Sequence, residues 1–377
     1  MIHILISIIY IFFSLSANCE VFSNYKNYKK TPIKFKIKEI SKNKLSYPWG
    51  MTFLDQNELL ITEKGGDLVK INVQTGESIR INHNIPHINS ISGQGGLLDV
   101  FAHSDGKLYF TYSHKKEKNK SSTAIARGDL IENSIKNLEI LLIGKPYLNI
   151  NKHWGARIAV KDENLFIGLG DRDGGMIAQD PTKHPGSIIR IKTDGSIPND
   201  NPFFKGFKNW LPEIYQIGLR NPQGIALSPI NGEIYFSQHG PRGGDNIGKV
   251  SFAGNYGWKD IAWGGTEYSG RKIGTKAFKN IYDKTLISWV PSIAVGSINF
   301  YKGDSFTEWN GDLLISATKA NLLARLKFRE DKVIEKEVII KDNPKIGRIR
   351  DFEIDSNGDI YIVSDDKKSS LWKIYRD

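Results

Sequence analysis

The chain has 377 residues and a formal net charge of +11. Its 36 glycines and 11% aromatic residues, set against only 3 methionines, favour many strands and turns over a helical bundle. The lysines are scattered among Asn and Ile, and no nucleic-acid-binding module is recognisable, so we expect a generally basic surface and no nucleic-acid partner. A local basic pocket that binds a small anion is the alternative.

The first residues, MIHILISIIYIFFSLSANC, form a short apolar run that ends in small residues. The positive charge of a typical signal peptide is missing, but Ala17-Asn18-Cys19 resembles a cleavage site. We therefore predict a signal peptide over residues 1–20, a leader over 21–35, and a periplasmic or secreted mature protein without stable membrane insertion. A retained membrane anchor is the alternative. Cys19 is the only cysteine, so no disulfide is expected in the mature domain.

Six segments share one pattern, in which a charged or polar residue is followed by apolar or aromatic residues and then a small one. Each segment is typical of a short buried strand. They recur at spacings of roughly 45 to 80 residues, as expected for propeller blades that carry loop insertions. The segments are ELLIT from Glu58, KLYFT from Lys107, NLFIG from Asn164, EIYFS from Glu233, DLLIS from Asp312 and DIYIV from Asp359.

Each of these strands follows another apolar strand, and most pairs are separated by a turn signal such as Ser104-Asp105-Gly106. Asp or Asn next to Gly favours a tight hairpin, because these residues tolerate positive φ. Several pairs are followed by a third strand, so the unit is an antiparallel meander. We predict an all-β fold, a six-bladed β-propeller of four-stranded antiparallel blades over residues 36–377. A β-sandwich would explain the strands but not one motif that recurs six times.

An antiparallel hairpin brings the start of its first strand and the end of its second strand to the same edge. In a propeller, these edges gather on one face around the central channel. Residues just before the first strands or just after the second strands should therefore converge there. The residues at these positions include Gln94, His153, Asp171, Arg220, Asn221, Gly240, Pro241, Lys319, Arg348 and Arg350.

Four cations of this set, Arg220, Lys319, Arg348 and Arg350, would meet near one channel mouth. Like charges held together cost free energy unless a polyanion joins them. Arginine pairs well with carboxylates, since its planar fork donates two parallel hydrogen bonds. We therefore expect a ligand with several carboxylates. The alternative is that each cation pairs with a nearby acid, such as Asp351 or Asp365.

Two histidines compete for a catalytic role. His153 lies at the shared edge together with Asp171, and a carboxylate near an imidazole could orient it as a general base. His239 lies in the glycine-rich loop SQHGPRGGD, which also contains Asp245. Such a loop could turn backbone carbonyls toward Ca²⁺, a hard cation that accepts oxygen ligands, although a glycine-rich loop alone is a weak metal signal.

The chain contains a series of long, specific strings: GQGGLLDV, HWGARIAV, GLGDRD, AQDPTKHPGSIIRI, DGSIPNDNPF, LRNPQGIAL, HGPRGGD, NYGW and GRIRDFEI. With them, the chain from about Tyr47 to the C-terminus resembles the soluble aldose sugar dehydrogenases of the glucose/sorbosone dehydrogenase family. Motif order is kept throughout. That family has a six-bladed propeller with its cofactor, pyrroloquinoline quinone (PQQ), over the channel mouth, so the resemblance implies the fold that the repeats predict.

The resemblance implies an oxidoreductase that depends on PQQ and calcium. It would oxidise aldose sugars at the anomeric carbon to lactones, by hydride transfer to the quinone, and pass the electrons to an external acceptor. His153 would be the general base that takes the proton of the anomeric hydroxyl, and Asp171 the acid that supports it. Arg220 would polarise the quinone carbonyl and stabilise the developing oxyanion.

The resemblance also implies binding residues. Backbone carbonyls of Gly240 and Pro241 would hold the Ca²⁺ ion that bridges to the cofactor. Lys319, Arg348 and Arg350 would hold the cofactor carboxylates. Further residues implied near the cofactor are Gln94, Asn221 and Tyr268.

One departure from the family concerns a further calcium site. Many relatives have GGDE where this chain has Gly243-Gly244-Asp245-Asn246. In the family, that acid has been associated with a second calcium, together with the tyrosine of NYGW, here Tyr256. Asn246 keeps a carbonyl oxygen but loses the charge, so any second site should be weaker.

Two other classes of function compete with a dehydrogenase. A calcium-dependent sugar-lactone hydrolase on the same fold would need an acidic metal cage in the channel, whereas the predicted face is cationic. A non-enzymatic binding propeller would not need His153, Arg220 and a carboxylate clamp together. The sequence is compatible with a monomer or a homodimer.

Overall fold

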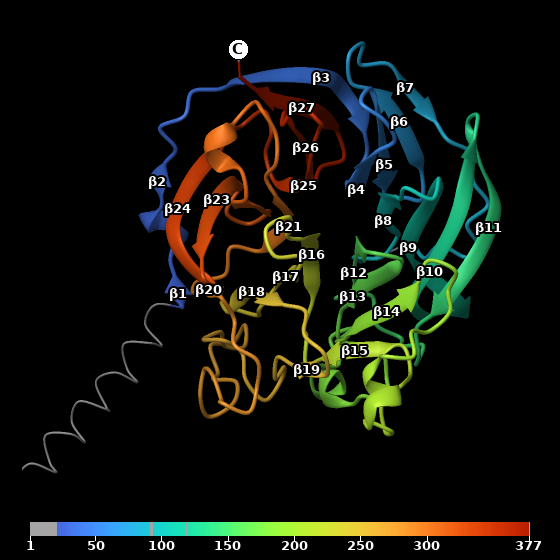
Figure 1. Ribbon diagram of the computed structural model, residues 1–377, viewed down its shortest axis with the longest axis vertical. Coiled ribbons are helices and arrows are strands. Elements are labelled where there is room, and N and C mark those ends of the chain that lie inside the picture. Colours follow the sequence, from blue (N-terminus) through green and yellow to red (C-terminus); the bar gives the residue numbers. More distant parts are fainter. Residues whose placement is uncertain (1–20, 91–92, 118, 377) are drawn as a thin grey trace, which may run out of the picture.

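The computed structural model describes residues 21–90, 93–117 and 119–376. The strands form six small sheets around a central axis (Figure 1), so the predicted six-bladed β-propeller is confirmed. The predicted signal peptide over residues 1–20 lies outside the described residues. Within the described ranges, no helix is long and apolar enough to cross a bilayer.

Each blade is a meander whose first strand lies nearest the axis. Blade 1 consists of β4 (Pro48–Phe53), β5 (Glu58–Glu63), β6 (Leu68–Asn72) and β7 (Ser78–Arg80). Blade 2 consists of β8 (Leu97–Ala102), β9 (Lys107–Glu117), β10 (Lys120–Ile131) and β11 (Ser134–Ile143). Blade 3 consists of β12 (Gly155–Lys161), β13 (Asn164–Leu169), β14 (Ile188–Lys192) and β15 (Ile214–Ile217), with the short parallel strand β19 (Gly254–Asn255) at its edge.

Blade 4 consists of β16 (Pro222–Leu227), β17 (Ile234–Gln238), β18 (Asp245–Lys249) and β20 (Ile287–Trp289). Blade 5 consists of β21 (Val295–Phe300), β22 (Leu313–Ala317), β23 (Leu322–Arg329) and β24 (Lys332–Lys341). Blade 6 consists of β25 (Ile349–Ile354), β26 (Ile360–Ser364), β27 (Ser369–Tyr375) and β3 (Lys36–Leu45). The 3₁₀ helices in the connections are η1 (Tyr25–Asn27), η2 (Gly175–Gln179), η3 (Pro202–Lys205) and η4 (Thr307–Trp309).

The N-terminal strand β3 closes the ring. It pairs antiparallel with β27, with Lys38 opposite Lys373, and forms the outer strand of blade 6 (Figure 1). One sheet therefore contains both ends of the propeller. Because the backbone hydrogen bonds of that sheet join the two ends, the ring opens only if they break.

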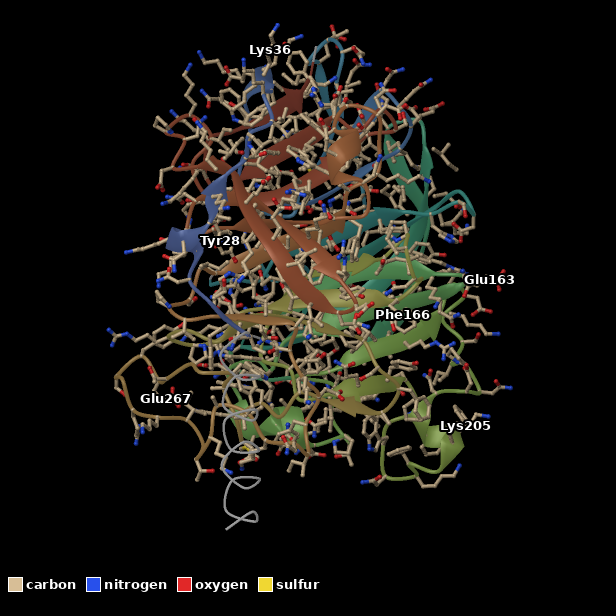
Figure 2. All side chains as sticks on the ribbon, turned by 60° about the vertical axis from the view of Figure 1, so that its left-hand side comes forward. Tyr28, Lys36, Glu163, Phe166, Lys205 and Glu267 are labelled. Atoms are coloured by element: carbon tan, nitrogen blue, oxygen red, sulfur yellow. The ribbon has the colours of Figure 1, made fainter. Side chains whose placement is uncertain are left out.

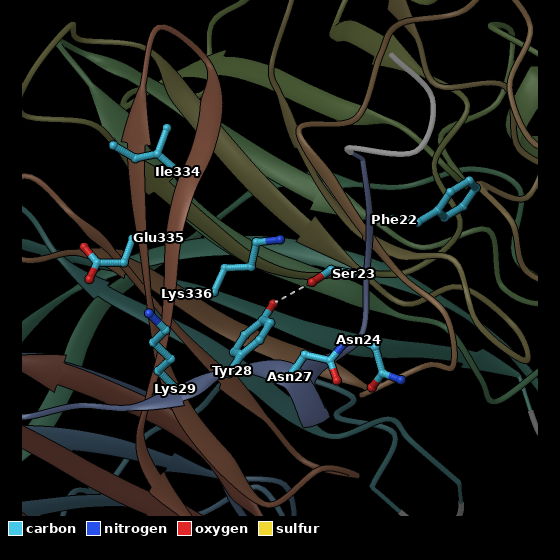
Figure 3. Close-up of a pocket in the computed structure, with 9 residues that line it drawn as sticks. All are labelled: Phe22, Ser23, Asn24, Asn27, Tyr28, Lys29, Ile334, Glu335 and Lys336. Atoms are coloured by element: carbon cyan, nitrogen blue, oxygen red, sulfur yellow. Dashed lines mark hydrogen bonds between the residues drawn. The ribbon is translucent and has the colours of Figure 1, made fainter. Parts of the chain in front are cut away.

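The residues predicted as a leader run along the outer edges of two blades before β3 begins. Within them, β1 (Phe22–Ser23) pairs in parallel with β20 of blade 4, and β2 (Lys29–Lys30) with β24 of blade 5. The Tyr28 hydroxyl accepts a hydrogen bond from Trp289 Nε1 at 2.7 Å and lies 3.2 Å from Ser23 Oγ (Figure 3). The segment thus connects the outer edges of blades 4, 5 and 6.

The middle strands of the blades are buried on both faces. In β5, Leu59, Leu60 and Ile61 are all fully buried, and every residue of β22 and β26 is buried. The blades stack face to face, so a middle strand has no solvent side and does not alternate between apolar and polar residues. This packing explains why the recurring segments were nearly continuous apolar runs.

A single guanidinium organises the inner strands around the channel. Arg157 of β12 donates through Nη1 to Asp99 Oδ1 at 3.0 Å and to Asp351 Oδ2 at 2.8 Å. Its Nε donates to the Gln223 carbonyl at 3.0 Å, and its Nη2 to the Trp49 carbonyl at 3.1 Å. Arg157 therefore ties blade 3 to blades 1, 2, 4 and 6. Its buried guanidinium and the buried carboxylates of Asp99 and Asp351 are partners of one another.

Acidic side chains line a cavity of about 290 Å³ along these inner strands. Burial raises the pKa of Asp99 to about 6, against the opposing charge of Arg157. Burial, reinforced by the neighbouring Asp351 and Asp99, raises the pKa of Glu353 well above its ordinary value. The cavity therefore favours the protonated form of at least one of these carboxyl groups.

Candidate active site

The predicted base and its supporting acid meet at the edge where the first strands begin. His153 precedes β12, Asp171 follows β13, and His153 Nδ1 lies 2.7 Å from Asp171 Oδ1. Both residues are buried. The glycine of GLGD is required for this approach, since a Cβ at Gly170 would lie 2.0 Å from the His153 carbonyl oxygen. The close contact between the connection before β12 and the turn after β13 therefore depends on residues of the HWGAR and GLGD motifs.

Asp171 is held in place by donors on several sides. Its Oδ2 accepts a hydrogen bond from Trp258 Nε1 at 2.6 Å and from the Gly175 backbone at 3.2 Å. Its Oδ1 accepts from the Asp173 backbone at 2.8 Å. A carboxylate fixed in this way orients the His153 ring through Nδ1, so that Nε2, which bonds to none of the described residues, is the atom available for proton transfer.

The backbone that carries His153 is in the left-handed region, with φ of 50°, and Arg172 has φ of 52°. Such conformations are strained for residues other than glycine and persist only when the surroundings hold them. Arg172 provides that support. Its Nε donates to the Lys152 carbonyl at 3.1 Å, its Nη1 to the Ser121 carbonyl at 3.2 Å, and its guanidinium lies 3.3 Å from the Trp154 ring centroid.

Arg220 lies next to this pair, with its guanidinium 5.3 Å from the ring centroid of Trp258, the residue that donates to Asp171. Its backbone carbonyl accepts a hydrogen bond from the Asp171 backbone at 2.7 Å, which couples the two connections. Its Nη1 donates to the carbonyls of Gly240, at 2.9 Å, and His239, at 3.2 Å. Among the described residues, its buried Nε has no hydrogen-bond partner. The guanidinium therefore keeps a donor for a ligand while its position is fixed.

Two predicted cofactor neighbours act directly on the loop that carries the base. Gln94 Oε1 accepts a hydrogen bond from the His153 backbone at 2.9 Å. Asn221 Oδ1 accepts from the Gly155 backbone and from Gln223 Nε2, both at 3.1 Å. Gln94 and Asn221 thus fix the two residues that flank Trp154.

The remaining predicted cations gather at the same mouth. Arg348 and Arg350 both pair with Asp365, at 3.2 Å and 2.8 Å, so the pairing with nearby acids considered above does occur. One carboxylate shared by two arginines leaves an excess of positive charge. The Nε of Arg350 is buried and has no partner in the described part of the chain. Lys319 is exposed just after β22 and forms no ion pair with a described residue.

His239, the competing histidine, lies among cations. Burial, together with the charges of Arg220, Arg350 and His153, lowers its pKa to about 3. It forms no ion pair with a described carboxylate, and its Nε2 has no hydrogen-bond partner among the described residues. An imidazole in these surroundings accepts a proton less readily than one held by an aspartate.

The donors left without partners test whether an acidic cofactor fits. The buried Nε atoms of Arg220 and Arg350 lack partners among the described residues, and Lys319, just after β22, is exposed. A cluster of cationic donors of this kind fits a ligand with several carboxylates, such as PQQ.

A calcium ion would depend on backbone oxygens. Among the described residues, no group of three or more His, Cys, Asp or Glu side chains is placed to hold a metal. The Gly240 carbonyl accepts from Arg220 but has a second lone pair, and the Pro241 carbonyl accepts no hydrogen bond from the described residues. These two oxygens fit the calcium ligands that the resemblance implies, together with oxygens of the cofactor.

Three other predicted residues lie apart from the cluster. Tyr268 is 72% exposed and makes no contact with it. The Tyr256 hydroxyl donates to the Lys249 carbonyl at 3.1 Å and accepts from the Lys249 backbone at 2.8 Å. Asn246 donates to the Gly244 carbonyl at 2.9 Å through its Nδ2. The polar groups of Asn246 and Tyr256 are thus occupied within blade 4.

Sequence reasoning missed two residues that support the base. Trp258 lies in the NYGW string, but nothing in the string indicates that its indole reaches Asp171, which is 87 residues away. Arg172 directly follows Asp171 in GLGDRD, and only the structure shows its contacts with the preceding connection. A charged residue beside a catalytic acid was the one available signal.

Comparisons with known proteins identify the family of the chain. A family model described as glucose/sorbosone dehydrogenase matches residues 45–373. The chain is 34% identical over 347 residues to aldose sugar dehydrogenase YliI of Escherichia coli strain K12, covering 89% of this chain and 92% of that protein. It is 25% identical over 422 residues to quinoprotein glucose dehydrogenase B of Acinetobacter calcoaceticus, covering 89% and 86%.

Among solved structures, the apo-form of the soluble aldose sugar dehydrogenase from Escherichia coli matches with a TM-score of 0.85 and 31% identity, covering 91% of this chain and 100% of that chain. The chain therefore belongs to the glucose/sorbosone dehydrogenase family, and the predicted enzyme class, a sugar dehydrogenase, is confirmed.

Proposed function

We propose that the protein oxidises aldose sugars at the anomeric carbon to lactones, with PQQ and Ca²⁺ as cofactors. The observation that carries the proposal is the 2.7 Å contact of His153 with Asp171, beside Arg220, at a mouth with unpartnered cationic donors. The names of the relatives support it, since the Escherichia coli matches are named aldose sugar dehydrogenase and the Acinetobacter calcoaceticus relative is named a quinoprotein.

The chain supplies the base and the charge for this reaction. When bound, the quinone supplies the acceptor for the hydride of the anomeric carbon. His153 Nε2 takes the proton of the anomeric hydroxyl, while Nδ1–H donates to Asp171, whose charge stabilises the imidazolium. Arg220 provides fixed positive charge where negative charge develops, in a buried site where such charge acts strongly.

Other residues of the mouth hold and orient the cofactor in this proposal. Lys319, Arg348 and Arg350 bind its carboxylates, with Arg350 as the most buried of the three. The carbonyls of Gly240 and Pro241 contribute to the calcium site. Tyr268 is 72% exposed, and its place beside the cofactor stays a prediction.

A lactone hydrolase is less compatible with the structure. The channel does hold the carboxylates of Asp99, Asp351 and Glu353, but Arg157 donates to two of them. No metal-holding group of acidic side chains occurs in the described ranges, and the mouth is cationic. A binding module would not need a strained histidine held against an aspartate.

The proposal includes export of the protein. Removal of about the first 20 residues would give a mature N-terminus near Glu20, outside the cytoplasm. Mass spectrometry of the native protein checks this directly. An intact Met1 in a membrane fraction would contradict it and indicate a retained anchor.

Reconstitution tests the central activity. Apoprotein is mixed with Ca²⁺ and PQQ, and a panel of aldoses is added while the absorbance spectrum of the cofactor is followed. We expect spectral reduction with at least one aldose, and loss of that signal when the protein is prepared with a calcium chelator. An unchanged spectrum with every aldose, together with hydrolysis of a sugar lactone, would establish the hydrolase instead.

A further inference from the structure

The two edges of the propeller differ in charge. The edge away from the site, here called the far edge, is formed in part by the turns at 54–57, 103–106, 162–163, 228–233, 301–312 and 355–359. Every one of them contains an acid; examples are Asp55, Asp105, Asp162, Glu233, Asp304 and Asp355. Within these turns, all of which the structure describes, Lys302 is the only Lys or Arg.

The edge that carries the site has the opposite character. Its turns follow the second strands, and its connections precede the first strands, of blades 3 to 6. We call six of their exposed cations the basic rim: Lys152, Arg242, Lys319, Arg348, Lys367 and Lys368. The same turns and connections also carry the exposed cations Lys145 and Lys345 and the exposed acids Asp173, Asp342 and Asp366. In Figure 2, Glu163 of the far edge lies on the opposite side of the molecule from Glu267, whose neighbour Thr266 bridges to Arg242.

Part of the basic rim forms no ion pair with the described residues. Lys152 lies 3.5 Å from Asp173, and Arg348 pairs with Asp365. The other four cations form no ion pair with a described residue; they are Arg242, Lys319, Lys367 and Lys368. On the far edge, by contrast, acids pair with strand residues, as Glu233 does with Lys249 at 2.5 Å.

The proposed reaction requires an electron acceptor at this mouth, so the inference rests on the proposed function. Oxidation of an aldose to its lactone releases two electrons and two protons. Two equivalents of a one-electron acceptor take one electron each, and the protons pass to the solvent. Because the electrons leave from the mouth, the acceptor approaches through the field of the basic rim.

We propose that the basic rim steers negatively charged one-electron acceptors to the channel mouth. The cofactor carboxylates would offset Lys319 and Arg348, which leaves Arg242, Lys367 and Lys368 to act on the acceptor. Rims of one charge sign raise association rates about 10- to 1000-fold at low ionic strength. The attraction extends over about 8 Å at physiological ionic strength and is screened by added salt.

Two half-reactions separate this inference from the proposed function. Holoenzyme is reduced with an aldose in a stopped-flow instrument, and the reduced enzyme is then mixed with an acceptor. The probes are ferricyanide, a trianion, and hexaammineruthenium(III), a trication, each at low and high ionic strength. The variants are Lys367→Glu, the triple variant R242E/K367E/K368E, and Lys302→Glu as the matched control on the far edge.

We expect the triple variant to slow reoxidation by ferricyanide about tenfold at low ionic strength and to leave it nearly unchanged at high ionic strength. Lys367→Glu should give a smaller loss of the same kind, and hexaammineruthenium(III) should react faster with both. Lys302→Glu should leave both rates at the wild-type level. Reduction by the aldose should be unaffected in every variant, since none of these residues contacts the base.

Equal ferricyanide rates and equal salt dependence in the wild type and the triple variant would overturn the inference and leave the proposed function standing. If no aldose reduces the cofactor, the proposed function fails on its own. In that case, calorimetry measures the binding of hexacyanocobaltate(III), a redox-inert trianion, and tests whether the basic rim attracts anions. Weaker binding to the triple variant than to Lys302→Glu supports steering, and equal binding contradicts it.

Discussion

The imidazole of His153 and the carboxylate of Asp171 lie 2.7 Å apart although they belong to two connections 18 residues apart in the chain. Gly170 permits the approach, and Trp258 holds the far oxygen of the carboxylate. Protein groups therefore hold the pair in contact. Its orientation leaves one ring nitrogen of His153 to face the substrate.

The first prediction concerns the supporting acid. Asp171→Asn should lower the rate constant of cofactor reduction about 10- to 1000-fold, because the amide has one acceptor oxygen where the carboxylate has two and carries no charge to stabilise the imidazolium. Stopped-flow reduction by a good aldose measures this. Asp173→Asn is the matched control, since Asp173 is exposed and lies 3.8 Å from His153 Nδ1. An equal decrease of this rate constant in the two variants would show that Asp171 does not support the base in particular.

The second prediction concerns cofactor affinity. Arg350→Ala should weaken binding of PQQ in a fluorescence titration of the apoprotein more than Arg348→Ala does. The side chain of Arg350 is only 15% exposed, against 54% for Arg348, so its charge is less screened. Arg271→Ala, on the exposed loop near Tyr268, should leave the titration unchanged. Wild-type affinity in both clamp variants would show that the carboxylates are held elsewhere.

The third prediction links the channel carboxyls to stability. Because the raised pKa lets the folded protein hold the Glu353 proton more tightly than the unfolded chain does, this group contributes stability below about pH 4. That contribution is lost as the pH rises through the folded pKa. Asp99, with a pKa of about 6, loses its contribution between about pH 4 and pH 6.

The substitution Glu353→Gln removes the pH-dependent contribution of Glu353 to stability. Between pH 4.5 and pH 8, the free energy of unfolding of the wild type should fall relative to the variant by on the order of 1 kcal/mol or more. Urea unfolding at both pH values measures the difference. Glu163→Gln, in an exposed turn, should show no such pH dependence. If the difference in the free energy of unfolding between the wild type and Glu353→Gln is the same at both pH values, the channel does not raise the pKa of Glu353.

The blades were largely predictable because each repeat is local. A segment such as ELLIT contains its own apolar run and lies a few residues from its hairpin partner, and it corresponds to β5. The pairing of β3 with β27 joins residues more than 300 positions apart, and no local pattern in KFKIKEISKNKL identifies its partner. The parallel strands β1 and β2 are two residues each, too short for any periodicity to appear.

In the site as well, local features could be predicted and contacts between blades could not. His153 and Asp171 were predicted from their positions at strand ends, and their contact follows from hairpin geometry. Arg157 was not predicted, because its partners come from four other blades and its own position in HWGAR looks like an ordinary strand residue. Contacts that depend on how blades are arranged around the axis are not encoded in any one repeat.

The assignment of the base is the central claim, and the two histidines give a direct comparison. His153→Ala should slow stopped-flow reduction of the bound quinone by a good aldose about 10²- to 10⁴-fold at full cofactor occupancy, as expected for loss of a positioned base. His239→Ala should be milder, because its imidazole lies among cations and has no carboxylate partner among the described residues. If His153→Ala reduces the quinone at the wild-type rate while His239→Ala does not, His239 is the base and the mechanism proposed for this site is wrong.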